Sequence, residues 1–192
     1  MVNWARLSFY FDDESWVVRY LVIETGVVET GLVETGGWPG GRPVLISPNS
    51  VSKVSRRDRL FHLTLTKKQA ENRPETDAHL RGAEAVTGYH IEARDGEIGH
   101  VHGFLLDDET WAIRYVEVAT RDWWPGRKVF VSPIWIEKAS WMESKLYVGL
   151  SREAILSAPE YVESTRVDRR YEDQLHSHYG RPPYWLHEKC QQ

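Results

Sequence analysis

The stretch FDDESWVVRYLVIETG (Phe11–Gly26) returns in the second half of the chain as LLDDETWAIRYVEVATR (Leu105–Arg121). When the two copies are aligned by their first aspartates, seven residues of the first recur in the second: Asp12, Asp13, Glu14, Trp16, Arg19, Tyr20 and Thr25. So many identities in so short a window indicate an internal repeat, in which each copy is one structural unit. The sequence therefore predicts two units of the same fold.

The composition is that of a globular protein. Of the 192 residues, 41% are hydrophobic and 27% are charged, which supplies core material and argues against a chain disordered throughout. The net charge of −4 gives no general attraction to nucleic acid or anionic lipid. No apolar run approaches the roughly 20 residues of a membrane helix, and the single cysteine, Cys190, can close no intramolecular disulfide. We expect a cytoplasmic protein without membrane insertion.

The hydrophobic pattern of the first copy predicts strands. Apolar and aromatic runs flank the acidic triplet at 12–14, which is the pattern of a hairpin with a polar turn. The strand over 16–23 is apolar on both faces, so another part of the protein must cover its outer face. A strand over 44–47 and a hairpin over 51–65 follow.

The first copy carries an insertion that the second lacks. Residues 22–36 read as three tandem pentapeptides, VIETG, VVETG and LVETG, and the extra residues are 27–36. A duplication tolerated in a surface loop is the preferred interpretation, since long insertions cost little closure entropy, and its Thr-Gly pairs suit small hairpins. The alternative is a strand-rich arm that pairs with another chain.

Residues 76–85 are polar and of mixed charge, which predicts a linker between a first repeat over 1–75 and a second over 86–161. Each repeat ends in a short helix stopped by a proline. The start of the second repeat, from Gly88, has no counterpart in the first half. The first repeat is therefore truncated, and it must lack part of its first strand or borrow a replacement.

Three runs resemble a PRC-barrel: GYHIEARDGEIGHVHGFLLDDETWAIRYVEV (Gly88–Val118), WWPGRKVFVSPIWI (Trp123–Ile136) and LYVGLS (Leu146–Ser151). This small β-barrel is shared by the cytoplasmic domain of the photosynthetic reaction centre H subunit and the C-terminal half of the ribosome-maturation factor RimM. The resemblance implies a mainly β fold of two tandem small barrels, each with a short C-terminal helix. It also implies a docking role, because family members mostly bind partners and share no catalytic residue.

Residues 162–192 form a tail after the second repeat. An apolar stripe predicts a helix over about 167–179, which Gly180 ends. The run RPPYW (Arg181–Trp185) then predicts an extended arm. Such an aromatic end is expected to pack on a barrel, in its own chain or in a partner. The stripe consists of Tyr171, Leu175 and Tyr179.

Three groups of residues are candidates for metal binding, and none matches a known ligand spacing. The acidic triplets at 12–14 and 107–109 could offer oxygens to Ca²⁺ or Mg²⁺, but consecutive residues of a tight turn cannot all face one ion, so a structural turn is preferred. His100 and His102 share one face of a predicted strand, and His90 could approach them across the hairpin. The tail adds His176, His178, His187 and Cys190. We predict no cofactor and retain His100, His102, His176 and His178 as the metal candidates.

Basic and aromatic residues supply the remaining candidates. Lys53, Arg56, Arg57 and Arg59 cluster at one predicted turn and could hold RNA phosphates, but the second repeat shows no such excess, so a solvated turn is preferred. The predicted interaction residues are aromatic, because large flat side chains near turns and in the tail can anchor a partner. They are Trp38, Trp123, Trp124, Tyr184 and Trp185, of which the first three could also plug a barrel end.

The sequence favours a protein that is not an enzyme. It contains no nucleophile motif, no phosphate-binding glycine loop and no pair of carboxylates spaced for acid and base roles. We predict a protein-interaction or scaffolding module that forms a homodimer and binds an unidentified protein partner, with nucleic acid disfavoured. The alternatives are a redox or metal-associated accessory protein and, after that, an RNA- or ribosome-associated factor.

Overall fold

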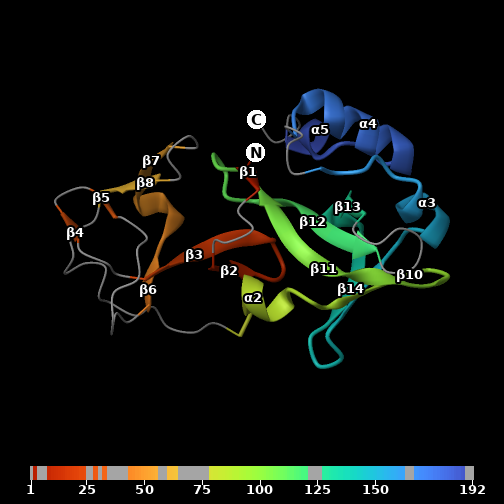
Figure 1. The fold of residues 1–192 in the computed structure, drawn as a ribbon, viewed down its shortest axis with the longest axis horizontal. Coiled ribbons are helices and arrows are strands. Elements are labelled where there is room, and N and C mark those ends of the chain that lie inside the picture. Colours follow the sequence, from red (N-terminus) through yellow and green to blue (C-terminus); the bar gives the residue numbers. More distant parts are fainter. Residues whose placement is uncertain are drawn as a thin grey trace. The chain divides into compact units, whose positions relative to one another are not determined.

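The structure is a computed structural model, and it describes residues 2–3, 8–24, 28–29, 32–33, 43–55, 60–64, 78–120, 127–162 and 167–188. The fold is mainly β (Figure 1). The chain divides into two compact units, which we call the N-terminal unit (residues 2–85 and 107–113) and the C-terminal unit (residues 86–106 and 114–192). Within the described ranges, no helix is both long enough and apolar enough to cross a membrane.

The first strands along the chain are β1 (Val2–Asn3), β2 (Phe9–Asp12), β3 (Val17–Glu24), β4 (Val28–Glu29), β5 (Leu32–Val33), β6 (Pro43–Ile46), β7 (Val51–Ser55), β8 (Leu60–Leu63) and β9 (Leu80–Gly82). The later strands are β10 (His90–Ala93), β11 (Gly96–Leu106), β12 (Ile113–Thr120), β13 (Lys128–Val131), β14 (Ile136–Ser140) and β15 (Lys145–Val148). The helices are η1 (Pro48–Ser50), α2 (Ala83–Val86), η2 (Pro133–Trp135), α3 (Arg152–Leu156), α4 (Arg169–Tyr179) and α5 (Tyr184–Glu188).

The C-terminal unit is built on a sheet with the strand order β13-β12-β11-β10-β15-β14. β10 and β15 run parallel, whereas β10–β11, β12–β13 and β14–β15 are antiparallel. Among the described strands the path has two ends, β13 and β14, and no closed barrel is seen. The core of this unit is aliphatic and aromatic, and its fully buried side chains include Ile91, Leu105, Leu106, Tyr115, Phe130, Leu146, Ile155 and Leu175.

The helices of the C-terminal unit begin and end at local signals. Ser151 caps α3 by accepting a hydrogen bond from the Ala154 N–H (3.2 Å). Asp168 caps α4 in the same way, accepting from the Tyr171 N–H (3.0 Å). Gly180 ends α4 with a φ of 59°, a left-handed conformation that glycine adopts without strain. Both helices lie where the sequence predicts them.

The N-terminal unit contains a four-stranded sheet in the order β6-β3-β2-β9. The hairpin of β2 and β3 and the strand β6 match the predicted strands. β9, in contrast, lies inside the segment predicted as a linker, where it pairs antiparallel with β2 and places Leu80 opposite Asp12. The polar sequence of this segment does not predict a strand. β9 forms because its backbone pairs with β2, which is distant in the sequence. The segment after the first repeat thus adds a strand to that repeat.

The inserted pentapeptides contain the short strands β4 and β5, which pair antiparallel with each other. Small hairpins were one of the predicted outcomes for this insertion, and its pairing with another chain stays a prediction. β7 and β8 form the predicted hairpin that follows β6. The helix predicted at the end of the first repeat lies outside the described residues.

The two acidic turns meet inside the N-terminal unit. The Val18 N–H donates to the Trp111 carbonyl (2.9 Å), and the Ile113 N–H donates to the Trp16 carbonyl (2.8 Å). These are equivalent positions of the repeat, so the pairing is symmetric. Both tryptophans have a positive φ, 55° for Trp16 and 60° for Trp111. Since this conformation is rare for an aromatic residue, surrounding contacts must stabilise it in both copies.

Candidate functional site: the docked C-terminal tail

The tail and the residue before it cover the edge strand β13. The register of β12 against β13 turns the carbonyls of Lys128 and Phe130 away from β12. Tyr161 donates its backbone N–H to the Lys128 carbonyl (2.8 Å), and Tyr179 of α4 donates its hydroxyl to the Phe130 carbonyl (3.1 Å). These carbonyls are therefore not available to another strand.

A polar centre lies buried between β12 and the tail helices. Tyr115 is 0% exposed, Glu172 is 1% exposed and His176 is 2% exposed. The Oε1 atom of Glu172 accepts hydrogen bonds from the hydroxyls of Tyr115 (3.1 Å) and Tyr184 (2.9 Å). Its Oε2 atom pairs with Nη1 of Arg169 (3.2 Å). We call these five residues the polar centre.

The Tyr115 hydroxyl lies between two side chains of α4. It donates to Oε1 of Glu172 (3.1 Å), and its oxygen is also 3.0 Å from Nε2 of His176, where the direction of the contact depends on the histidine tautomer. Burial raises the pKa of Glu172 despite its hydrogen bond from Tyr184 and its ion pair, and burial lowers the pKa of His176. The centre thus joins β12 to α4 and α5 through buried hydrogen bonds.

Two arginines stack on the aromatic rings of α5. The guanidinium of Arg169 lies 4.0 Å from the ring centre of Trp185, and that of Arg114 lies 4.0 Å from the ring centre of Tyr184. A cation over an aromatic face is attractive, most of all where water is partly excluded. Both aromatic side chains are half-buried. The predicted interaction residues Tyr184 and Trp185 therefore make intramolecular contacts that hold the tail in place.

The extended arm predicted through Trp185 is wrong, because helix α5 begins at Tyr184. The carbonyl of Pro183 accepts a hydrogen bond from the Leu186 N–H (3.1 Å), and a proline before or within the first turn is compatible with a helix. A helix this short is not stable by itself. Its stability comes from contacts with β12 and α4, which the local sequence does not reveal.

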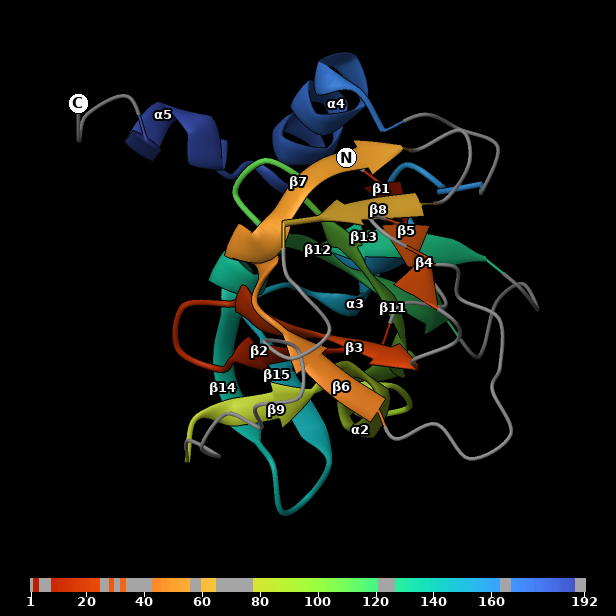
Figure 2. The ribbon, with the colours of Figure 1, turned by 90° about the vertical axis from the view of Figure 1, so that its left-hand side faces the viewer.

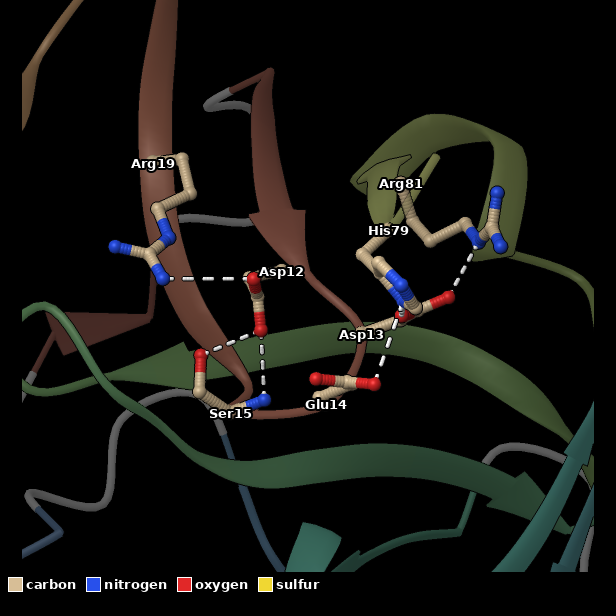
Figure 3. A network of polar contacts seen from close by, with 7 residues as sticks. All are labelled: Asp12, Asp13, Glu14, Ser15, Arg19, His79 and Arg81. Atoms are coloured by element: carbon tan, nitrogen blue, oxygen red, sulfur yellow. Dashed lines mark hydrogen bonds and ion pairs between the residues drawn. The ribbon is translucent and has the colours of Figure 1, made fainter. Parts of the chain in front are cut away.

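The first aspartate of each acidic triplet caps its own turn. Asp12 accepts hydrogen bonds at Oδ1 from the Ser15 side chain (2.7 Å) and backbone N–H (2.8 Å), which lower its pKa, and it pairs with Arg19 (3.4 Å) (Figure 3). In the second copy, Asp107 accepts from the Glu109 N–H (3.0 Å). Both aspartates are therefore turn residues, which is the preferred interpretation of the sequence.

The second aspartate of the first triplet fastens β9. Asp13, whose side chain is 7% exposed, pairs through Oδ2 with Nε of Arg81 (2.8 Å) and through Oδ1 with Nδ1 of His79 (3.1 Å). His79 also lies 3.6 Å from a carboxylate oxygen of Glu14 (Figure 3). Sequence reasoning missed these contacts. Their only signal was the mixed charge of the segment predicted as a linker.

The histidines of the second repeat have separate partners. His90 lies opposite His100 across β10 and β11, as predicted, but its Nδ1 contacts a carboxylate oxygen of Glu97 (2.9 Å). His102 points to Glu117, with its Nε2 atom 4.0 Å from Oε1. His90 and His102 therefore contact different carboxylates, and their strand face does not gather the histidines into one metal site.

The tail histidines also lie apart in their contacts. His176 belongs to the polar centre, whereas His178 is exposed and its Nε2 donates to the Ala154 carbonyl (2.8 Å). The side chain of His187 and all of Cys190 lie outside the described residues. In the ranges that the structure describes, no three His, Cys, Asp or Glu side chains are placed together to hold a metal ion.

Most of the other predicted site residues fall outside the part of the chain that the structure describes. These are Trp38, Trp123 and Trp124 among the aromatic candidates and Arg56, Arg57 and Arg59 of the basic cluster. Lys53 is exposed on β7. The RNA contact and the tryptophan anchors therefore stay predictions.

A comparison with models of known protein families finds no match, and a search of curated proteins finds none either. The resemblance to PRC-barrels therefore rests on the sequence motifs alone.

Tyr115 and Glu172, which sequence reasoning did not select, carry the best-defined polar site of the C-terminal unit. One hint was present, because Glu172 is a charged residue next to Tyr171 of the apolar stripe.

Proposed function

We propose that the protein is a non-catalytic interaction module of two tandem PRC-type barrels, which docks a protein partner through its C-terminal unit and forms a homodimer. The exposed side chain of Leu186 on α5 carries this proposal. Among the described residues, four large apolar side chains are at least half exposed, and all lie in the C-terminal unit: Ile134 (60%), Met142 (100%), Val162 (51%) and Leu186 (50%). Exposure of a single apolar residue is common and does not by itself mark a contact. An exposed apolar side chain on a well-held element can anchor a protein partner.

Leu186 is the best supported of the four. It follows Trp185 on α5, and that helix is held by the Arg169–Trp185 stack (4.0 Å) and by the hydrogen bond from Tyr184 to Glu172 (2.9 Å). A partner that covers Leu186 does not have to order the helix first. A preformed surface of this kind lowers the entropic cost of binding.

The test is affinity capture from the native host with the full chain as bait. Wild type is compared with Leu186→Ser and with the matched control Met142→Ser, which removes a still more exposed apolar side chain from the turn between β14 and β15. We expect a partner that wild type and the control retain and that Leu186→Ser loses by about tenfold or more. Equal retention of the partner by all three chains would contradict docking through α5. An enzymatic activity of the wild-type chain that is lost when Glu172 is substituted would contradict a non-catalytic role.

The two alternative functions have their own tests. Metal content of protein purified without chelator tests the metal-associated role. Salt-dependent RNA binding that disappears on charge reversal of Arg56, Arg57 and Arg59 would favour the ribosome-associated role.

A further inference from the structure

We propose that β6 is the edge through which two copies of this chain pair, strand to strand and antiparallel, with Leu45 at the two-fold axis. The inference rests on the homodimer of the proposed function and assigns its surface. That surface belongs to the N-terminal unit, whereas Leu186 belongs to the C-terminal unit.

The outward groups of β6 follow from the register of the sheet. β3 and β6 lie side by side (Figure 2), with Val22 opposite Leu45 and Glu24 opposite Pro43. The Val22 N–H donates to the Ser8 carbonyl (2.9 Å), on the side of β2, so its backbone groups face away from β6. Because hydrogen-bonding residues alternate in antiparallel pairs, the N–H and carbonyl of Leu45 and the carbonyl of Pro43 point away from β3. Among the described residues, none makes a hydrogen bond to these groups.

The equivalent strand of the C-terminal unit has the same outward carbonyls, and both accept hydrogen bonds. Leu45 aligns with Phe130 and Pro43 aligns with Lys128. The carbonyls of Phe130 and Lys128 accept from the Tyr179 hydroxyl (3.1 Å) and the Tyr161 N–H (2.8 Å). Among the described residues, helix α4, which supplies Tyr179, follows the second repeat and has no counterpart after the first. The described part of the N-terminal unit therefore keeps available the acceptors that the C-terminal unit covers.

A second β6 complements this edge group by group. When Leu45 lies opposite the partner's Leu45, the two residues exchange N–H to carbonyl hydrogen bonds in both directions. Pro43 then lies opposite the partner's Ser47, and Ser47 has an extended backbone (φ −64°, ψ 135°). Proline has a carbonyl but no N–H, and the Ser47 carbonyl already accepts from the Ser50 N–H (2.9 Å). This pair therefore needs one bond only, from the Ser47 N–H to the Pro43 carbonyl.

This match favours a second copy over an unrelated peptide. An unrelated strand would present both an N–H and a carbonyl at each pairing position. Its N–H opposite Ser47 would meet a carbonyl that is already used, and its carbonyl opposite Pro43 would meet no donor. A second β6 avoids both losses, because its own Pro43 and Ser47 lie at these positions. The strand is short, and stable interfaces bury about 1,200 Å² or more in total, so we expect a reversible dimer whose population depends on protein concentration.

The test places charges of either sign at residue 45, which lies on the proposed two-fold axis of the dimer, in the full chain. Leu45→Lys and Leu45→Glu each place two like charges directly opposite one another, and each is expected to raise the dimer Kd by about tenfold or more in sedimentation equilibrium. An equimolar mixture of the two variants should restore the dimer, because a lysine then faces a glutamate. Met142→Lys and Met142→Glu, at a fully exposed site, are the matched controls and should leave the Kd unchanged.

The outcomes separate the pairing from the proposed function. Rescue on mixing supports the β6 pair, since a variant that had simply failed to fold would not recover. Dimers that persist in both Leu45 variants, or a loss that mixing does not rescue, would overturn β6 as the homodimer surface and leave the homodimer itself standing. A wild-type chain that stays monomeric at every concentration would overturn both. Partner capture through Leu186 is decided independently by its own variants.

Discussion

The two repeats share a core sequence and complete their sheets differently. In the C-terminal unit an aromatic tail covers β13 and surrounds Tyr115, which is fully buried. In the N-terminal unit the short strand β9 is fastened by the Asp13–Arg81 ion pair (2.8 Å), and Tyr20, the repeat equivalent of Tyr115, is only half-buried. The duplicated core thus sets the strands, and the added segments decide how each sheet is completed.

Removing the tail should have the largest effect, because it makes the C-terminal unit resemble the N-terminal one. A chain that ends after Val162 loses the buried side chains of Tyr171, Leu175 and Tyr179. Since fully burying one such side chain contributes about 1.5–3 kcal/mol, we expect the free energy of unfolding to fall by about 5 kcal/mol or more. Urea unfolding measures the loss, and light scattering should show more self-association as β13 opens. Wild-type stability in the shortened chain would show that the tail is not part of the core.

Removing one hydroxyl tests the covered edge itself. Tyr179→Phe keeps the ring and leaves the Phe130 carbonyl without its donor. A buried polar group without its partner costs about 1–3 kcal/mol, which urea unfolding can measure. In the control Tyr147→Phe, the lost hydroxyl contacts exposed Glu143 (3.3 Å), and we expect a change within about 0.5 kcal/mol. Equal effects in the two variants would show that the hydrogen bond from Tyr179 to β13 adds no more stability than an exposed one.

Removing the ion pair that holds β9 in the N-terminal unit should lower the free energy of unfolding by somewhat less. Asp13→Ala removes the partner of Arg81 and His79, and we expect a loss of about 1–2 kcal/mol together with faster hydrogen exchange of the β9 amides. Glu14→Ala is the control, because that side chain is 75% exposed and such ion pairs contribute at most about 1 kcal/mol. If β9 exchange is unchanged in Asp13→Ala, the ion pair does not hold this strand.

The smallest expected difference is the pH dependence of the polar centre. Because burial raises the pKa of Glu172 above its ordinary value of 4.5, the folded chain keeps this proton at pH values where the unfolded chain has released it. This contribution to stability is present below pH 4.5 and is lost as the pH rises through the raised pKa. Glu172→Gln cannot ionise, so wild type should lose stability relative to this variant as the pH rises from 4.5 through the raised pKa of Glu172.

Urea unfolding of both chains across that range measures this difference. His176 acts in the opposite direction, because burial lowers its pKa, so its contribution is lost as the pH falls below 6.5. It is present in both chains and largely cancels in the comparison. A difference between the chains that stays constant with pH would contradict a raised pKa for Glu172.

Local signals explain the parts of the fold that could be predicted. An alternation of apolar runs and an acidic turn marks β2 and β3, and the turn closes through a hydrogen bond from Ser15 to Asp12 three residues away. α4 is bounded by the cap at Asp168 and the left-handed Gly180, which act over a few residues. Such interactions can be inferred from a short window because both partners lie inside it.

The sequence by itself determined the repeat, the main hairpins and the position of α4. Only the tertiary structure decided that β9 joins β2, that α5 is helical, and that Glu172 of α4 is buried against β12. The hydrogen bond from Tyr115 to Glu172 joins residues 57 positions apart, and the pair of Asp13 and Arg81 spans 68. No local pattern links such partners, because what brings them together is the burial of apolar surface across the whole unit.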